Sequence, residues 1–159
     1  MRWPPRLNRP YRPCVGIMLI NHDNQVFVAQ RLDHPSNAWQ MPQGGINPDE
    51  DPLDAAFREL KEEIGTNQAT LIATAKKQYT YDIPAPLNNK IWQGRYRGQR
   101  QQWYLMRFEG SDEDIDLGTH TPEFSAWRWA PLEELLDLVV HFKRGVYLEV
   151  IKEFKEYLK

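Results

Sequence analysis

The segment between Asp51 and Gly65 constrains the fold of this chain more than any other part of the sequence. Asp51 is a good helix N-cap, Pro52 suits the first helical position, and Gly65 is the residue type that most often ends a helix. Between these ends the apolar residues recur at helical spacing and form one stripe, which consists of Leu53, Ala56, Phe57, Leu60 and Ile64. The sequence therefore predicts a helix over residues 52–64 with one face buried in a core.

The same helix carries three glutamates on a second face. Glu59, Glu62 and Glu63 stand at i, i+3 and i+4, where like charges oppose helix formation by roughly 0.2–0.5 kcal/mol per pair. Because each residue turns the helix by about 100°, the three glutamates are centred roughly 120° around the helix axis from the apolar stripe. Acids at this spacing are most often a solvated helix face, with Arg58 and Lys61 here to soften the repulsion. The other interpretation is a site for hard divalent cations, which prefer carboxylate oxygens.

The loop before the helix favours the cation site. Gly44 and Gly45 allow the backbone to approach a ligand closely, and Glu50 adds another oxygen donor near the helix start. Simple turn geometry is an equally good reason for either glycine, and the two roles are compatible.

The rest of the chain reads as strands with few helices. Strands are predicted at 15–20, 25–31, 69–74, 77–83, 101–108 and 124–129, and further helices at 131–138 and 144–158. Residues 1–13 are rich in proline and arginine and are expected to form an extended N-terminal arm. A length of 159 residues suits one domain, so we expect a single α+β domain over 1–159, with a mixed sheet flanked by helices.

Charge and cysteine content limit the functional classes. The formal net charge of −2 argues against a protein that coats polyanions, so any such binding must come from local patches. A single cysteine, Cys14, rules out an internal disulfide and suits a reducing cytoplasm. The apolar run at 15–20 is too short to span a membrane. We therefore expect a cytoplasmic protein without a membrane partner.

The segment GGINPDEDPLDAAFRELKEEIGT, which starts at Gly44, resembles the Nudix box. Eight specified positions match, namely Gly44, Glu50, Arg58, Glu59, Leu60, Glu62, Glu63 and Gly65, while Thr66 stands where the motif has an aliphatic residue. Segments from Tyr11 to about Phe154 are similar to bacterial RNA pyrophosphohydrolases and to plant-type dinucleoside tetraphosphate hydrolases. The resemblance implies the α/β/α Nudix sandwich, with the box as a loop–helix–loop.

The resemblance also implies which residues hold a metal. Glu59, Glu62 and Glu63 would bind Mg²⁺, for which Mn²⁺ could substitute, and Arg58 would orient a glutamate. Glu123 matches a further metal-binding carboxylate, on the resemblance alone. Catalytic roles are expected for Arg58, Glu63 and Glu123, and either of the two acids could be the general base.

Contacts to the substrate are implied for a further set of residues. Phosphate would meet Arg12, Gln99, Arg100 and Gln101, and the backbone of Gly44 and Gly45 would face phosphate or the metal site. A nucleobase would lie between Phe142 and Arg31, close to Lys143. Two plainer interpretations remain open: the basic segment 90–101 is an ordinary solvated loop rather than a polyphosphate clamp, and Phe142 is a core residue between two helices.

Three functions are compatible with these residues. The first is a pyrophosphohydrolase that removes pyrophosphate from the 5′-triphosphate end of RNA and so initiates mRNA decay. The second is an asymmetrical hydrolase of dinucleoside polyphosphates such as diadenosine tetraphosphate. The third is a catalytically silent Nudix module that binds nucleotide, which the retained box acids disfavour. The chain is expected to be a monomer.

Overall fold

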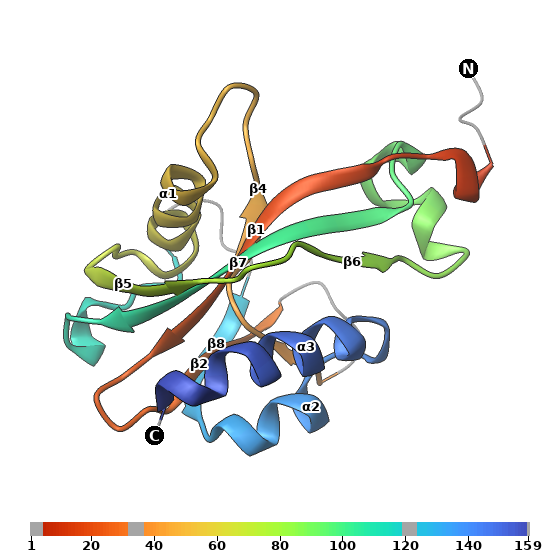
Figure 1. The fold of residues 1–159 in the computed structure, drawn as a ribbon. Helices are drawn as coiled ribbons and strands as arrows, with labels where there is room; N and C mark the ends of the chain where they lie inside the picture. The colour runs from red at the N-terminus through yellow and green to blue at the C-terminus, as the bar shows by residue number, and fades with distance from the viewer. Residues whose placement is uncertain (1–4, 32–36, 119–123, 159) are drawn as a thin grey trace.

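A mixed sheet forms the centre of the computed structural model, which describes residues 5–31, 37–118 and 124–158 (Figure 1). Within these residues the strands are β1 (Tyr11–Ile20), β2 (Val26–Arg31), β3 (Trp39–Gln40), β4 (Gln43–Gly45), β5 (Ala69–Thr74), β6 (Tyr79–Asp82), β7 (Gly98–Phe108) and β8 (Phe124–Ala130). They follow the order β3-β2-β1-β7-β5, while β4 pairs with β1, β6 with β7 and β8 with β2. The pairing of β1 with β7 is parallel and the other pairings are antiparallel.

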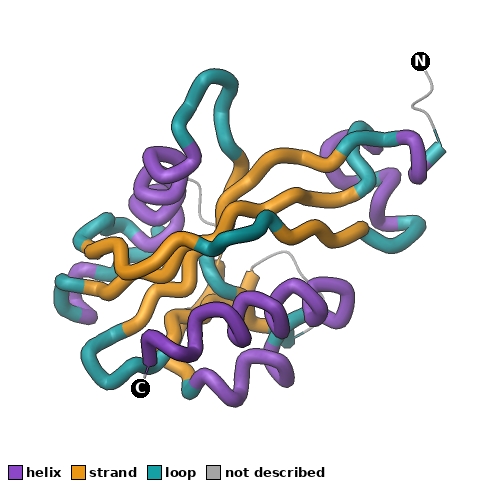
Figure 2. The backbone as a smooth tube through the Cα atoms, viewed as in Figure 1, coloured by secondary structure: helices purple, strands orange, loops and turns teal. Residues whose placement is uncertain are grey.

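Helices cover both faces of this sheet. They are α1 (Pro52–Ile64), α2 (Leu135–Leu138) and α3 (Arg144–Phe154). Short 3-10 turns occur at Arg6–Asn8, Leu87–Asn89, Ile91–Gly94, Asp112–Asp114, Leu132–Glu134, His141–Lys143 and Lys155–Leu158. Helix α1 lies on one side of the sheet, and α2 and α3 lie on the other (Figures 1 and 2). The predicted α/β/α sandwich is confirmed.

Alternation along the central strands builds a separate apolar layer under each helical face. On β1, Ile17 and Leu19 belong to the layer that contains Leu60 of α1, whereas Met18 packs with Trp103 in the layer under α3. Successive strand residues point to opposite faces, so a strand covered on both sides reads as one continuous apolar run. This is why residues 15–20 contain no charged side chain.

Helix α1 begins and ends where the sequence predicts. The Asp51 side chain accepts a hydrogen bond from the Leu53 N–H at 2.8 Å, which caps the helix. Gly65 has φ 82° and ψ −5°, and its N–H donates to the Lys61 carbonyl. A left-handed residue of this kind favours glycine because it carries no Cβ.

The N-terminal boundary differs from the expected arm. Residues 11–13 are the start of β1 and pair with β7 from Gly98 onward. The Arg97 N–H donates to the Pro10 carbonyl at 3.0 Å, and the Arg97 guanidinium lies 4.7 Å from the centre of the Tyr11 ring. Parallel pairing therefore extends the strand into a segment whose proline content suggested no element. At the other end, α3 stops at Phe154 and tightens into a 3-10 turn.

Within the described ranges, the longest helices fall short of the length and apolar character that a membrane crossing requires.

At Gly16 the indole of Trp103 on the neighbouring strand β7 lies so close to the backbone that no side chain fits. Gly16 is buried opposite Trp103, and a Cβ at this position would overlap the indole ring. We predict that Gly16→Ala lowers the free energy of unfolding by about 1–3 kcal/mol, because the added methyl overpacks the layer under α3. Urea denaturation followed by circular dichroism measures this change.

Gly145→Ala is the matched control for this substitution. Gly145 lies in α3, and a Cβ there would meet no atom within 4 Å. Alanine is preferred over glycine in helices, so this variant should be as stable as the parent or more stable. Equal destabilisation by both substitutions would contradict the overpacking at Gly16.

Candidate active site

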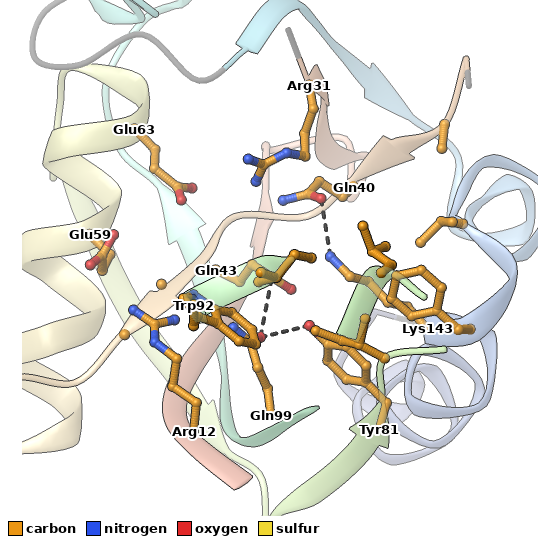
Figure 3. Close-up of a pocket in the computed structure, with 18 of the residues that line it drawn as sticks. Arg12, Arg31, Gln40, Gln43, Glu59, Glu63, Tyr81, Trp92, Gln99 and Lys143 are labelled. Atoms are coloured by element: carbon orange, nitrogen blue, oxygen red, sulfur yellow. Dashed lines mark hydrogen bonds between the residues drawn. The ribbon is translucent and has the colours of Figure 1, made fainter. Parts of the chain in front are cut away.

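A pocket of about 730 Å³ opens between α1 and the segment that joins α2 to α3, and Figure 3 shows its lining. It brings together residues that are far apart in the sequence. Its lining consists of Arg12, Arg31, Ala38, Trp39, Gln40, Gln43, Gly44, Gly45, Glu59, Glu63, Tyr81, Ile83, Leu87, Ile91, Trp92, Gln99, Val140, Phe142 and Lys143. Nine of the predicted site residues lie here, among them both glycines and two of the box glutamates.

The acidic end of the pocket is formed by α1 and β4. Glu59 and Glu63 project from the helix into the lining (Figure 3), and Glu63 is only 7% exposed. A Cβ on Gly44 would overlap the Glu59 carboxylate, and a Cβ on Gly45 would overlap the Arg12 guanidinium. The two glycines therefore allow close approach of charged groups to the backbone, beyond what a turn alone would need.

Arg58 connects the loop before α1 to the helix. Its guanidinium donates to Glu50 at 2.8 and 2.9 Å and to the Gly45 carbonyl at 2.8 Å. The Nη1 atom also donates to Glu59 at 2.9 Å and to Glu62 at 3.2 Å. One arginine thus offsets the repulsion between neighbouring acids and orients Glu59.

The same contacts shift the ionisation of the charged partners. The hydrogen bond from Arg58, followed by one from the Asn47 backbone, lowers the pKa of Glu50 to about 2. The bond to Glu50 in turn raises the pKa of Arg58 above its ordinary value. The loop and helix are therefore held by an ion pair that stays charged at neutral pH.

The donors at the acidic end fit a hard divalent cation. Glu59 and Glu63 supply carboxylate oxygens beside the Gly44 backbone, and Mg²⁺ is usually bound by one or two carboxylates together with substrate phosphates. Among the described residues no group of three or more His, Cys, Asp or Glu side chains converges on one point. Glu62 lies outside the pocket lining and is paired with Arg58. Glu123 lies outside the described residues.

The opposite end of the pocket combines aromatic rings with a buried cation. Lys143 is 7% exposed, donates to the Gln40 Oε1 atom at 3.2 Å, and lies 5.7 Å from the centre of the Tyr81 ring. Burial, followed by repulsion from Arg31, lowers the pKa of Lys143 to about 8. Phe142 is half-buried, packs 5.8 Å from Tyr81 and lines the pocket, so it is in part a core residue and in part a pocket surface.

Gln40 keeps a hydrogen-bond donor available at this end. Its Oε1 atom must accept, because the Lys143 ammonium can only donate, and this assigns the Nε2 atom to the other side of the amide. Within the described part of the chain, this buried Nε2 has no hydrogen-bond partner. A buried donor of this kind is suited to an acceptor on a ligand.

A cluster of glutamines forms the middle of the pocket. The Gln99 Oε1 atom accepts hydrogen bonds from the Tyr81 hydroxyl at 2.7 Å, from Gln43 at 3.3 Å and from Gln101 at 3.2 Å. Gln99 lines the pocket, whereas Gln101 is 1% exposed and supports Gln43 and Gln99 from behind. Arg100 is exposed and does not line the pocket, because alternate residues of β7 face opposite sides of the sheet.

The basic segment 90–101 contributes to the pocket differently from the predicted clamp. Arg97 is paired with Asp82 at 2.8 Å, and Lys90, Arg95 and Arg100 are exposed outside the lining. The residues of this segment that reach the pocket are Ile91, Trp92 and Gln99.

Sequence reasoning missed several lining residues, namely Gln40, Gln43, Tyr81 and Trp92. One signal for such residues is present in the sequence: six tryptophans in 159 residues is a high count, and rings of this kind can serve as contact surfaces.

The α/β/α sandwich and a pocket lined by box glutamates define the class of Nudix hydrolases. A family model described as the NUDIX domain matches residues 10–150, and the chain belongs to the Nudix family. Enzymes of this family generally need divalent cations.

The chain is similar along almost its whole length to two proteins named RNA pyrophosphohydrolase. It is 51% identical over 153 residues to that of Rickettsia rickettsii (strain Sheila Smith), which covers 96% of this chain and 95% of the relative. It is 53% identical over 148 residues to that of Rickettsia canadensis (strain McKiel), which covers 93% of this chain and 92% of the relative.

Solved structures agree on the fold. The E. coli dihydroneopterin triphosphate pyrophosphohydrolase superposes with a TM-score of 0.69 at 21% identity, over 91% of this chain and 99% of that one. A C. elegans Ap4A hydrolase binary complex superposes with a TM-score of 0.63 at 23% identity, over 91% of this chain and 98% of that one. At these identities the likeness shows the fold alone.

The ion pair between Glu50 and Arg58 predicts an acid-sensitive component of stability. Because folding lowers the pKa of Glu50 from 4.5 to about 2, this stabilisation is complete above pH 4.5 and is lost as the pH falls toward 2. Glu50→Gln should have a lower Tm than the parent at pH 7. Between pH 4.5 and 2, the Tm of the variant should fall less than the Tm of the parent. The exposed Glu133→Gln is the control, and a parent-like pH profile for Glu50→Gln would contradict the prediction.

The buried ammonium of Lys143 gives a second prediction. Its ¹³Cε resonance should titrate near pH 8 in the parent, because burial disfavours the charged form. Gln40→Leu removes the accepting Oε1 atom, so the midpoint should move lower still. Lys143→Met assigns the resonance by removing it. A midpoint unchanged by Gln40→Leu would show that the hydrogen bond does not stabilise the ammonium.

Proposed function

We propose that this chain removes pyrophosphate from the 5′-triphosphate end of RNA. One observation carries the proposal: a single pocket joins two box carboxylates at one end to aromatic rings and a buried lysine at the other. A polyphosphate attached to a nucleobase has matching parts. The names of the two Rickettsia relatives support RNA as the substrate.

The acidic end would hold Mg²⁺, with Mn²⁺ able to substitute. Glu59 and Glu63 are the proposed primary ligands. Glu62 and Glu123 are further proposed ligands, and Glu62 is also paired with Arg58 at 3.2 Å. When bound, the cation neutralises charge on the phosphate oxygens and lowers the pKa of a water molecule.

The chain's own residues would orient the phosphates and move the proton. Arg12 binds phosphate oxygens next to Gly45, and Gln99 and the backbone of Gly44 and Gly45 add further contacts. Arg58 keeps Glu59 in position through its bond at 2.9 Å. Glu63, with Glu123 as the alternative, takes the proton of the water that attacks phosphorus. Pyrophosphate leaves and the RNA keeps a 5′-monophosphate.

The other end of the pocket would hold a base. Arg31 and Phe142 would lie on its two faces, and Lys143 would donate to an acceptor on its edge. Gln101 would act indirectly, through its hydrogen bond to Gln99. Arg100 is exposed on the other face of β7, so any contact that it makes with phosphate would lie outside the pocket.

The remaining features of the proposal are a single domain over residues 1–159, a monomer, a cytoplasmic location and a role in initiating mRNA decay. In this role, the RNA with a 5′-monophosphate would be the substrate for the later steps of decay.

An asymmetrical dinucleoside polyphosphate hydrolase is the second candidate. The segment YDIP, which resembles the plant-type enzymes, supplies Tyr81 and Ile83 to the pocket lining. Diadenosine tetraphosphate offers the same combination of polyphosphate and base. A silent binding module is disfavoured because Glu59 and Glu63 both line the pocket.

A direct comparison of the two substrates tests the proposal. Purified protein is incubated with Mg²⁺ and either 5′-triphosphorylated RNA or diadenosine tetraphosphate, and products are separated by chromatography. A higher kcat/KM for RNA, with pyrophosphate released, is the expected result. A higher kcat/KM for the dinucleotide supports the second candidate, and turnover of neither substrate overturns both.

Glu63→Gln should lower kcat by at least about 10²-fold, because it removes a negative ligand and a general base. The fold should remain intact by circular dichroism, since glutamine is almost the same size. Asp54→Asn on the same helix is the control, because Asp54 is exposed and outside the pocket lining. Near-normal turnover by Glu63→Gln would remove Glu63 from the reaction.

A further inference from the structure

Trp92 lies on the pocket in contact with Arg12. It belongs to the turn Ile91–Gly94 between β6 and β7, and both residues line the pocket (Figure 3). The Arg12 guanidinium lies 5.0 Å from the centre of the indole ring. Tryptophan is the aromatic side chain that attracts a cation most strongly, and the planar guanidinium packs well on a ring.

Arg12 is also bounded on a second side. A Cβ on Gly45 would overlap the Arg12 guanidinium, so the guanidinium packs directly against the backbone of β4. The Gly45 backbone and the indole therefore both lie against the guanidinium. Tyr96 supports the indole edge-on, with ring centres 5.8 Å apart and planes at 82°.

The backbone that presents Trp92 is unusual for its sequence. Trp92 has φ 51° and ψ 33°, Gln93 has φ 58° and ψ 27°, and Gly94 has φ 75°. Left-handed conformations place the Cβ too close to the following carbonyl in residues other than glycine. Such conformations persist where the surrounding structure holds them, often at functional sites. Glycine would relieve the strain at position 92 but could not supply the ring.

The consecutive glycines place this contact beside the acidic end. Gly44 packs against Glu59 and Gly45 packs against Arg12, and adjacent Cα atoms are about 3.8 Å apart. A phosphate near the Glu59 carboxylate is therefore within reach of the guanidinium. The direction in which Arg12 points its N–H groups decides whether it donates to that phosphate.

We infer that Trp92 is a positioning residue that fixes the guanidinium of Arg12 for binding the polyphosphate of the substrate. The inference rests on the proposed function in one respect, namely that the pocket holds a phosphate chain. Trp92 acts through Arg12, and its effect does not depend on the base that the substrate carries.

Binding of inorganic tripolyphosphate tests this role, because the ligand has no base. Calorimetry without divalent cation is performed on the parent, Trp92→Leu, Arg12→Ala and the double variant. Trp92→Leu should weaken binding about 5- to 10-fold, as expected for a partly desolvated cation–π contact. In the Arg12→Ala background the same substitution should have no further effect, and Trp92→Phe should recover most of the affinity.

Two outcomes overturn the inference. One is unchanged tripolyphosphate binding by Trp92→Leu together with weaker RNA binding, which would make Trp92 a base-stacking residue. The other is an additive loss in the double variant. The binding assay does not measure RNA hydrolysis, so the two hypotheses can fail separately. If Trp92 and Arg12 are coupled in tripolyphosphate binding but the protein does not hydrolyse RNA, the proposed function is rejected and the positioning role of Trp92 remains.

A spectroscopic measurement keeps the test valid if Trp92→Leu loosens the turn. The ring current of the indole should shift the Arg12 Nε–H resonance in the parent, and Trp92→Leu should abolish the shift while Trp92→Phe keeps part of it. Trp39→Leu is the matched control, because that ring lies 5.3 Å from Arg128 instead. An Arg12 resonance that is the same in parent and Trp92→Leu overturns the inference.

Discussion

The hydrogen bonds of Arg58 are the interaction on which the acidic end of the pocket depends. A single guanidinium binds Glu50 and the Gly45 carbonyl on the loop, and Glu59 and Glu62 on the helix. Glutamates crowded on one helix face repel each other, and a shared arginine converts that repulsion into a link between two segments. The loop is therefore held against α1 by the chain's own side chains, and Glu59 lies against Gly44.

Charge is distributed along the pocket in the order that a nucleoside polyphosphate would require. Carboxylates lie at the α1 end, Arg12 lies beside them, and Lys143 is buried with Tyr81 and Phe142 at the far end. The cost of burying an ammonium is reflected in the lowered pKa of Lys143 and is reduced by the acceptor that Gln40 supplies. The acids come from α1, whereas Phe142 and Lys143 come from the 3-10 turn His141–Lys143 that precedes α3, so the two ends of the pocket belong to different elements.

Local patterns predicted the elements well, but they did not predict the direction in which each side chain points. Helix α1 begins and ends where its cap, proline and glycine indicate, because these signals act within a few residues. For the basic segment 90–101 the sequence leaves a polyphosphate clamp and a solvated loop open; in the structure Arg97 pairs with Asp82, and the segment supplies Trp92 to the pocket. Three neighbouring residues were grouped as phosphate contacts, but strand alternation directs Gln99 and Arg100 to opposite faces. Composition reports which side chains are present, and the direction of each one follows from strand register.

The sequence by itself determined the Nudix helix, the order of most strands and helices along the chain, and the acids that stand on one face of that helix. Each of these depends on periodicity, capping or a motif confined to neighbouring residues. Only the tertiary structure decided that Arg12 lies against Gly45 and Trp92, that Lys143 donates to Gln40, and that Gln101 donates to Gln43. These contacts join residues from separate elements, and they exist because the parallel pairing of β1 with β7 and the packing of helices on both faces bring those elements together.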